Sequence, residues 1–169
     1  MDFICLRCGT CCRNLLDKTN GVTQGLFLTE KETALFPPEI IAPRVGIGLD
    51  EPTVIVAYQV NTDICPHLGD SSKCKIYEKR PLMCKAFPYS KGNISSKCMF
   101  FSPKKREQFY SNIFPMVEMR KADQELNEFC LNILRGHFKA GIKEWLYDLA
   151  AKKWVVKAQY DSLPEVFLI

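Results

Sequence analysis

The sequence predicts an α+β fold in which a small, irregular cysteine-rich core with few short strands precedes a mainly helical C-terminal region. Three observations lead to this prediction. Eight of the nine cysteines lie between Cys5 and Cys98. The apolar runs in that part are short, whereas from about Lys121 apolar residues recur at steps of three and four, the spacing of one helix face. We therefore expect residues 1–102 to form the cysteine-rich domain and residues 103–169 to form a helical extension that packs on it.

The first elements expected along the chain are a short strand and a short helix. Leu26-Phe27-Leu28 is a compact apolar run of the length of a short strand. Thr29 with Glu32 has the spacing of a capping box, in which each residue's side chain accepts a hydrogen bond from the other's backbone amide. This pattern predicts a helix over residues 30–36, which Pro37-Pro38 would end.

A second strand is expected over Thr53–Val60, because T-V-I-V-A-Y-Q-V is rich in β-branched residues and is bounded by turn-forming residues on both sides. Gly46-Ile47-Gly48 lacks the rest of a dinucleotide-binding fingerprint, so we interpret it as a turn. The apolar residues 154–156 and 163–169 are expected to pack back on the core. A surface for a partner is the alternative interpretation of that tail.

The C-terminal region is expected to contain one long amphipathic helix. Gly136 and Gly141 are the positions at which this helix could break. Its apolar positions are Leu126, Phe129, Cys130, Ile133, Leu134, Phe138, Ile142, Trp145, Leu146 and Leu149. Cys130 falls on this apolar face, where we expect a buried and unreactive thiol. His137 lies at the edge of the same face and is expected to have a structural role.

A dense group of thiols opens the chain in the run C-L-R-C-G-T-C-C. It contains Cys5, Cys8, Cys11 and Cys12. Two residues between cysteines is the spacing at which a tight turn can point two sulfurs at one metal centre. Three cysteines at that spacing can hold three corners of an iron–sulfur cubane, and the same run can also supply zinc ligands. The pattern therefore predicts a metal-binding core.

Four further cysteines lie beside turn-forming or loop sequence, where backbone amides can point at sulfur. They are Cys65, Cys74, Cys84 and Cys98. Cys65 opens C-P-H-L, and Cys84 ends a run that begins at Cys74 and continues to Phe87-Pro88. Prolines at these places restrain the loops. All eight cysteines are therefore candidate metal ligands, and His67 is a further candidate that could replace a thiolate.

These motifs together resemble a known family. The runs C-x2-C-G-x-C-C, C-P-H-L and C-x-I-Y-E-x-R-P-x-x-C-x-x-F-P, over roughly Phe3 to Cys98, resemble the CxxCxxCC zinc- or iron-chelating domain family (YkgJ-like). The resemblance implies a small metal-chelating domain. The cysteine pattern is also similar to the cysteine-rich part of flagellin lysine N-methylases, where it is associated with an iron–sulfur cluster.

The metal and its ligand set stay open at this point. Structural zinc sites usually have paired C-x2-C knuckles, whereas a triple run with widely spaced single cysteines favours an iron–sulfur cluster, [4Fe–4S] first, with zinc as the alternative. Eight thiols suffice for two four-thiolate sites or for one cluster with spares. Cys11 and Cys12 are adjacent, so we expect their side chains to diverge. Arg80 could donate hydrogen bonds to thiolates or form a surface ion pair, and Tyr77 is expected to pack beneath the cluster loops.

Composition restricts the class of protein further. The net charge is only +4, and the one dense basic run, Lys104-Lys105-Arg106, is expected to be a solvated helix start, so we expect no nucleic-acid partner. No apolar stretch is long enough to span a bilayer, and no leader pattern is visible, which predicts no membrane association and a cytoplasmic location. In that reducing compartment the thiols stay available for metal, and their odd number argues against a disulfide framework.

Four functions fit the sequence. The favoured one is a metal-binding protein with a redox or partner-binding role, which implies a protein partner. The alternatives are an iron–sulfur-dependent protein-modifying enzyme that is lysine N-methylase-like, a metal chaperone, and a structural zinc-binding interaction domain. Since no nucleophile with its base, paired carboxylates or nucleotide loop is visible, the sequence favours a binding module over an enzyme.

Overall fold

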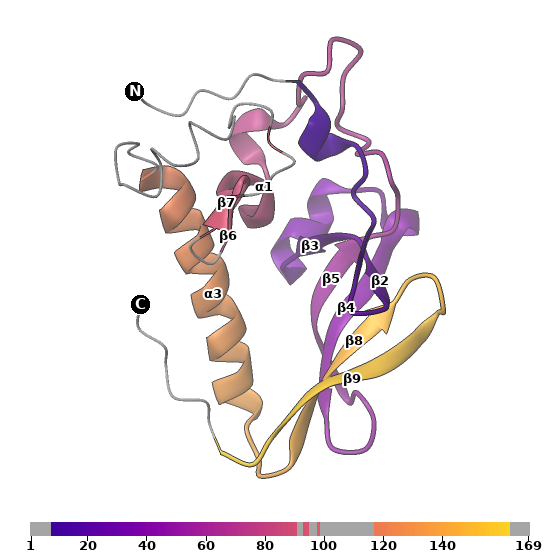
Figure 1. Ribbon diagram of the computed structural model, residues 1–169, viewed down its shortest axis with the longest axis vertical. Coiled ribbons are helices and arrows are strands. Elements are labelled where there is room, and N and C mark those ends of the chain that lie inside the picture. Colours follow the sequence, from indigo (N-terminus) through magenta and orange to yellow (C-terminus); the bar gives the residue numbers. More distant parts are fainter. Residues whose placement is uncertain (1–7, 91–92, 95–97, 99–116, 163–169) are drawn as a thin grey trace. The chain divides into compact units, whose positions relative to one another are not determined.

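The computed structural model describes residues 8–90, 93–94, 98 and 117–162 (Figure 1). The chain forms two compact units, each built from two separate stretches of sequence. Unit 1 comprises Met1–Leu15 and Asp63–Asn127, and unit 2 comprises Leu16–Thr62 and Glu128–Ile169. The boundary between them falls inside the long helix α3 (Val117–His137), which therefore contributes residues to both units.

Unit 2 is built on a five-stranded antiparallel sheet with the strand order β3-β5-β4-β8-β9. The strands are β3 (Leu26–Leu28), β4 (Ile41–Gly48), β5 (Val54–Val60), β8 (Ile142–Asp148) and β9 (Lys153–Tyr160). Figure 1 shows β4, β5, β8 and β9 as long twisted strands. A separate hairpin joins β1 (Asp17–Thr19) to β2 (Val22–Gln24). Its turn residues Asn20 and Gly21 both have positive φ, the conformation that an Asn-Gly hairpin turn requires.

Two short 3₁₀ helices connect β3 to β4 in unit 2. They are η2 (Glu30–Leu35) and η3 (Pro38–Ile40). The predicted capping box is present at the start of η2, where the Thr29 amide donates to the Glu32 carboxylate over 2.8 Å. This confirms the expected short helix and its start. The strand predicted at Leu26–Leu28 is confirmed as β3, and the one predicted over Thr53–Val60 is confirmed as β5.

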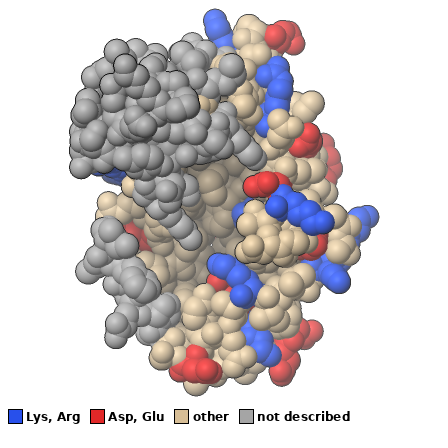
Figure 2. Space-filling view, in the orientation of Figure 1, with Lys and Arg blue, Asp and Glu red and all other residues tan. Residues whose placement is uncertain are grey.

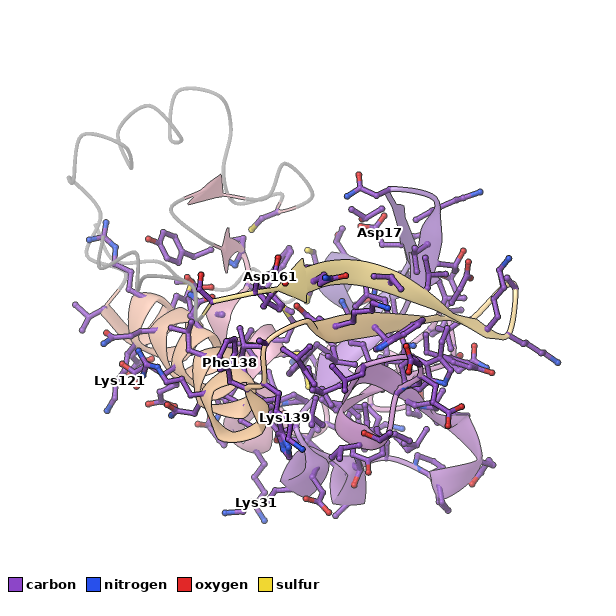
Figure 3. All side chains as sticks on the ribbon, turned by 90° about the horizontal axis from the view of Figure 1, so that it is seen from below. Asp17, Lys31, Lys121, Phe138, Lys139 and Asp161 are labelled. Carbon is purple, nitrogen blue, oxygen red and sulfur yellow. The ribbon has the colours of Figure 1, made fainter. Side chains whose placement is uncertain are left out.

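The core of unit 2 lies where the C-terminal half of α3 packs against strands of the sheet. Ile47, Leu134 and Ile142 are buried together there. Phe138, which follows the end of α3, packs against the same cluster (Figure 3). The ring of Phe129 meets that of Phe27 edge to face, with the ring centroids 6.2 Å apart. These apolar contacts explain why this half of the helix is amphipathic.

The described elements of unit 1 are short apart from its share of α3. They are the 3₁₀ helices η1 (Thr10–Cys12) and η4 (Tyr77–Lys79), the helix α1 (Leu82–Ala86) and the ribbon of β6 (Tyr89–Ser90) with β7 (Asn93–Ile94). Leu68 and Cys74 form an isolated antiparallel bridge that closes the loop between them. Short helices, loops and turns therefore position the described cysteines of this unit.

The predicted α+β fold, with few short strands in its first part and a mainly helical C-terminal region, is wrong. Helix α3 ends at His137, and Gly141, with φ +79°, precedes the hairpin of β8 and β9. The apolar residues of 142–149 have helical spacing, but β8 pairs with a strand on each side, and this pairing outweighs the local pattern. The described chain is mostly β-sheet, with α3 as its one long helix.

Two smaller expectations are also wrong. Gly46-Ile47-Gly48 is the end of β4 and not a turn. A Cβ at Gly46 would lie 3.2 Å from the ring of Trp154, so this glycine permits close packing in a strand. Cys130, expected to be buried, is exposed on α3. Lys104-Lys105-Arg106 and residues 163–169 lie outside the described residues.

The described surface carries mixed charge. On the face drawn in Figure 2, Lys and Arg side chains are interspersed with Asp and Glu side chains, and no large patch of one sign is visible in its described part. Among the described helices, none is long and apolar enough to cross a membrane.

Candidate metal centre

The loop at the start of unit 1 brings two adjacent thiols together. Gly9, with φ +73°, precedes η1, and the amide of Cys12 donates to the carbonyl of Gly9 over 3.0 Å. The tight turn places the Sγ atoms of Cys11 and Cys12 4.0 Å apart. The expectation that these side chains diverge is therefore wrong, because the 3₁₀ turn rotates them toward the same side.

A second loop brings Cys65 beside this pair. The amide of Cys65 donates to the carbonyl of Cys12 over 2.9 Å, and the amide of Leu15 donates to the carbonyl of Asp63 over 2.9 Å. The two loops thus lie side by side although about fifty residues separate them in sequence. The thiols of Cys12 and Cys65 also interact, so Cys12 is a neighbour that Cys11 and Cys65 share.

Two further thiols act electrostatically on this group. Cys74 lies at the bridge to Leu68, where the amide of Lys75 donates to the carbonyl of His67 over 2.9 Å. Cys84 lies on the short helix α1. Both interact electrostatically with Cys11 and Cys65. We call Cys11, Cys12, Cys65, Cys74 and Cys84 the thiol cluster.

The hydrogen bonds within the thiol cluster separate its members by acidity. A hydrogen bond from Cys12 lowers the pKa of Cys11 to about 7. The hydrogen bond with Cys12, aided by the backbone amides of His67 and Leu68, lowers the pKa of Cys65 to about 6. The pKa of Cys12 is raised because its proton is held by hydrogen bonds to these two sulfurs. Cys11 and Cys65 thus ionise first, and thiolate is the form that binds metal.

Burial governs the other two thiols. Removal from water disfavours the charged form, which raises the pKa of Cys84 and that of Cys74. A buried thiol that resists ionisation on its own can still bind metal, because the metal replaces the proton as the positive partner. The cluster thus combines two readily ionised thiols with thiols that a metal would have to deprotonate.

The remaining predicted ligands differ in their surroundings. Cys8 is exposed, with its Sγ 3.2 Å from the hydroxyl of Thr10. Cys98 is buried. Cys5 lies outside the described residues. His67 is half-buried beside Cys65, and its charge favours the thiolate of Cys65.

Two residues that sequence reasoning passed over help to shape the site. The Arg13 guanidinium donates to the carbonyl of Cys8 over 3.4 Å and to the hydroxyl of Ser72 over 3.2 Å, which ties the first loop to the loop that ends at Cys74. A Cβ added at Gly9 would clash with the Arg13 guanidinium and crowd Leu68 and Ser72, so the glycine leaves room for this tie. The Gly within C-G-T-C-C was the available signal, since a turn of this kind favours positive φ.

Cysteine sulfurs are suitable ligands for zinc or iron, but the described side chains lie too far apart to surround an ion. Among the described residues, no three Cys, His, Asp or Glu side chains stand close enough to hold an ion. The 4.0 Å between the sulfurs of Cys11 and Cys12 nevertheless approaches the about 3.8 Å that two thiolates span on a tetrahedral zinc, given Zn–S bonds of about 2.3 Å. Metal binding would therefore draw the other thiols inward.

Comparison with known proteins agrees with this chemistry. Residues 4–130 match the CxxCxxCC family, described as a "Putative zinc- or iron-chelating domain". Since the match spans most of the chain, this protein belongs to that family of cysteine-rich domains. No curated protein and no solved structure matches the chain.

Proposed function

We propose that unit 1 holds an iron–sulfur cluster of the [4Fe–4S] type, and that this centre has a redox or partner-binding role. The candidate ligands are the cysteines predicted from the sequence: Cys5, Cys8, Cys11, Cys12, Cys65, Cys74, Cys84 and Cys98. When bound, such a cluster would supply one-electron chemistry or a rigid surface. The chain's own contribution is to gather the thiols and provide amide donors to them.

One observation carries this proposal: five thiols from four separate segments share a single electrostatic neighbourhood. A tetrahedral zinc and a [4Fe–4S] cubane each take four protein ligands, so either would leave at least one of these thiols unused. A multinuclear centre can accept thiolates on separate irons. The number of thiols therefore does not separate the two candidates, and the triple C-x2-C-x2-C run of Cys5, Cys8 and Cys11 is what favours a cluster.

A zinc site is the second candidate, and the spacing of Cys11 and Cys12 favours it. Their 4.0 Å separation suits two ligands of the same ion. In a cubane each iron carries one protein thiolate, and these point outward from different corners, which spreads the sulfurs further apart.

Anaerobic purification followed by analysis of iron, acid-labile sulfide and zinc tests both candidates. Brown protein with nearly equal iron and sulfide is expected from the first proposal. Colourless protein that contains zinc without sulfide would replace it with the second. Protein that contains neither metal, and takes up neither on anaerobic reconstitution, would contradict both.

A further inference from the structure

Arg80 has an unusually well-defined place beside the thiol cluster. It follows η4 and precedes Pro81, the residue before α1. Its Nε donates to the carbonyl of Tyr77 over 2.7 Å, and its Nη1 donates to the carbonyl of Cys84 over 3.5 Å. Its Cζ lies 3.8 Å from the centroid of the Tyr77 ring. Contacts on an aromatic face and at two carbonyls hold the guanidinium in one position.

The charge of Arg80 acts on several thiols of the cluster. It interacts electrostatically with Cys11, Cys74 and Cys84, which come from three separate segments of unit 1. Among the described residues, its contacts are the Tyr77 ring and the carbonyls of Tyr77 and Cys84, and an ion pair found there joins Lys157 to Glu144. The half-buried guanidinium therefore lies within electrostatic reach of these thiols.

Metal binding changes the charge of this neighbourhood. Four neutral thiols that bind Zn²⁺ release four protons and gain two positive charges, so the site becomes dinegative. Negative charge away from bulk water is costly unless a cation or hydrogen-bond donors lie close. A cation that is already fixed in place needs no reorganisation when this charge develops.

We propose that Arg80 is the charge-compensating residue of the thiol cluster: its guanidinium, held by the Tyr77 ring and two backbone carbonyls, offsets the negative charge that the thiolates acquire with metal. This inference rests on the proposed function and adds a positioning role for a residue that does not bind the metal. The planar guanidinium can stack on the ring and donate to carbonyls at once.

The test measures Zn²⁺ affinity of the metal-free, reduced full-length chain by competition with a chromophoric chelator. Arg80→Gln removes the charge, Arg80→Lys keeps it, and Lys79→Gln removes an equal charge from the neighbouring exposed residue. We expect Arg80→Gln to weaken Zn²⁺ binding by about tenfold or more, since changes in groups next to metal ligands typically cost 10–100-fold. Arg80→Lys keeps the charge but loses the planar stack on Tyr77, so it should lose clearly less affinity than Arg80→Gln, and Lys79→Gln should equal the wild type.

Each outcome bears on the inference. Wild-type affinity in Arg80→Gln would overturn it while leaving metal binding by unit 1 intact. Equal losses in Arg80→Lys and Arg80→Gln would also overturn it, because the guanidinium would then act as a scaffold and not through its charge. A wild-type chain that binds no Zn²⁺ would overturn it as well, and the iron and sulfide analysis would then decide the proposed function independently.

Discussion

The geometry of the first cysteine loop depends on Gly9. Its φ of +73° lies in the left-handed region, and an added Cβ would stand 3.1 Å from both Leu68 Cδ1 and Ser72 Cβ. We therefore expect Gly9→Ala to lower the free energy of unfolding of unit 1 by at least about 1 kcal/mol and to weaken metal binding. Urea unfolding and Zn²⁺ titration measure these two effects.

A matched control for Gly9→Ala is available on α3. A Cβ at Gly136 would meet nothing within 4 Å, and its backbone is not left-handed. Gly136→Ala should leave Zn²⁺ binding unchanged and stabilise the helix by up to about 1 kcal/mol. If Gly9→Ala behaves like this control, the turn at position 9 does not require a glycine.

Individual thiols make a second prediction at the residue scale. Cys65 is buried and hydrogen-bonded within the thiol cluster, whereas Cys130 is exposed and belongs to unit 2. Cys65→Ser should lose most of the bound metal, and Cys130→Ser should retain it. Metal content after anaerobic purification decides the matter. If Cys130→Ser loses its metal and Cys65→Ser retains it, the assignment of the metal centre to the thiol cluster is wrong.

At the scale of elements, Gln59 joins three parts of unit 2. It is fully buried on β5. Its amide donates to the carbonyls of Pro43 over 2.7 Å and Tyr147 over 3.1 Å, and its carbonyl accepts from the amide of Gly25 over 2.8 Å. One side chain thus satisfies backbone groups next to β3, on β4 and on β8.

Replacing this side chain should be costly. Gln59→Leu leaves buried backbone groups without partners, so we expect the free energy of unfolding to fall by about 3 kcal/mol. Gln159→Leu, at an exposed position on β9, should change it by less than about 0.5 kcal/mol. Urea denaturation of both variants gives the comparison. Similar small effects in the two would show that water replaces the lost hydrogen bonds.

The turn between β8 and β9 predicts a dependence on pH. The Asp148 carboxylate accepts from the amides of Ala151, Ala150 and Thr23 over 3.1, 2.9 and 3.4 Å, and these hydrogen bonds lower its pKa. Because the unfolded chain then binds the proton more tightly, the stabilisation is complete above the usual pKa of about 4 and declines as pH falls through the lowered value.

Asp148→Asn isolates this effect. The variant should unfold at lower urea concentration than the wild type at pH 6, and the difference between the two midpoints should shrink toward pH 3. A constant difference over this range would mean that the charge of Asp148 adds nothing to its hydrogen bonds.

Local patterns predicted the short elements well and the long C-terminal one poorly. The capping box at Thr29 and the β-branched run before Val60 act within a few residues, so the sequence alone identifies them. Residues 142–149 have apolar spacing that suits a helix, yet hydrogen bonds to β4 and β9 decide their structure. Strand β4 is remote in sequence, so the spacing of apolar residues within 142–149 could not predict that pairing.

At the scale of the whole molecule, the cysteine motifs identified the donor atoms but not their assembly. The run at Cys11 and the loop at Cys65 meet in unit 1, while the 47 residues Leu16–Thr62 between them belong to unit 2 with the end of α3. Because each unit is built from two separate stretches of sequence, no single change in composition along the chain marks the boundary between them. The contact between Cys12 and Cys65 likewise depends on backbone hydrogen bonds that no spacing rule contains.

This division predicts that metal stabilises the two units unequally. The described helices of unit 1 other than α3 are at most five residues long, and its thiol cluster lies on these helices and on loops, whereas unit 2 has a five-stranded sheet with its own apolar core. Metal that binds only the folded form at a thousand times its Kd contributes about 4 kcal/mol. Removal of the metal should therefore destabilise unit 1 much more than unit 2.

Hydrogen exchange followed by mass spectrometry, with and without a chelator, measures this difference directly. Peptides over Cys65–Ala86 should lose protection by a large factor in the metal-free chain, while peptides from β4, β5 and β8 should change little, since the hydrogen bonds of the sheet are independent of the thiols. Arg80→Gln should give an intermediate loss over the same unit 1 peptides at limiting metal. Equal loss in both units would contradict the independence of the sheet, and full protection over Cys65–Ala86 without metal would show that the thiol cluster does not depend on metal for its structure.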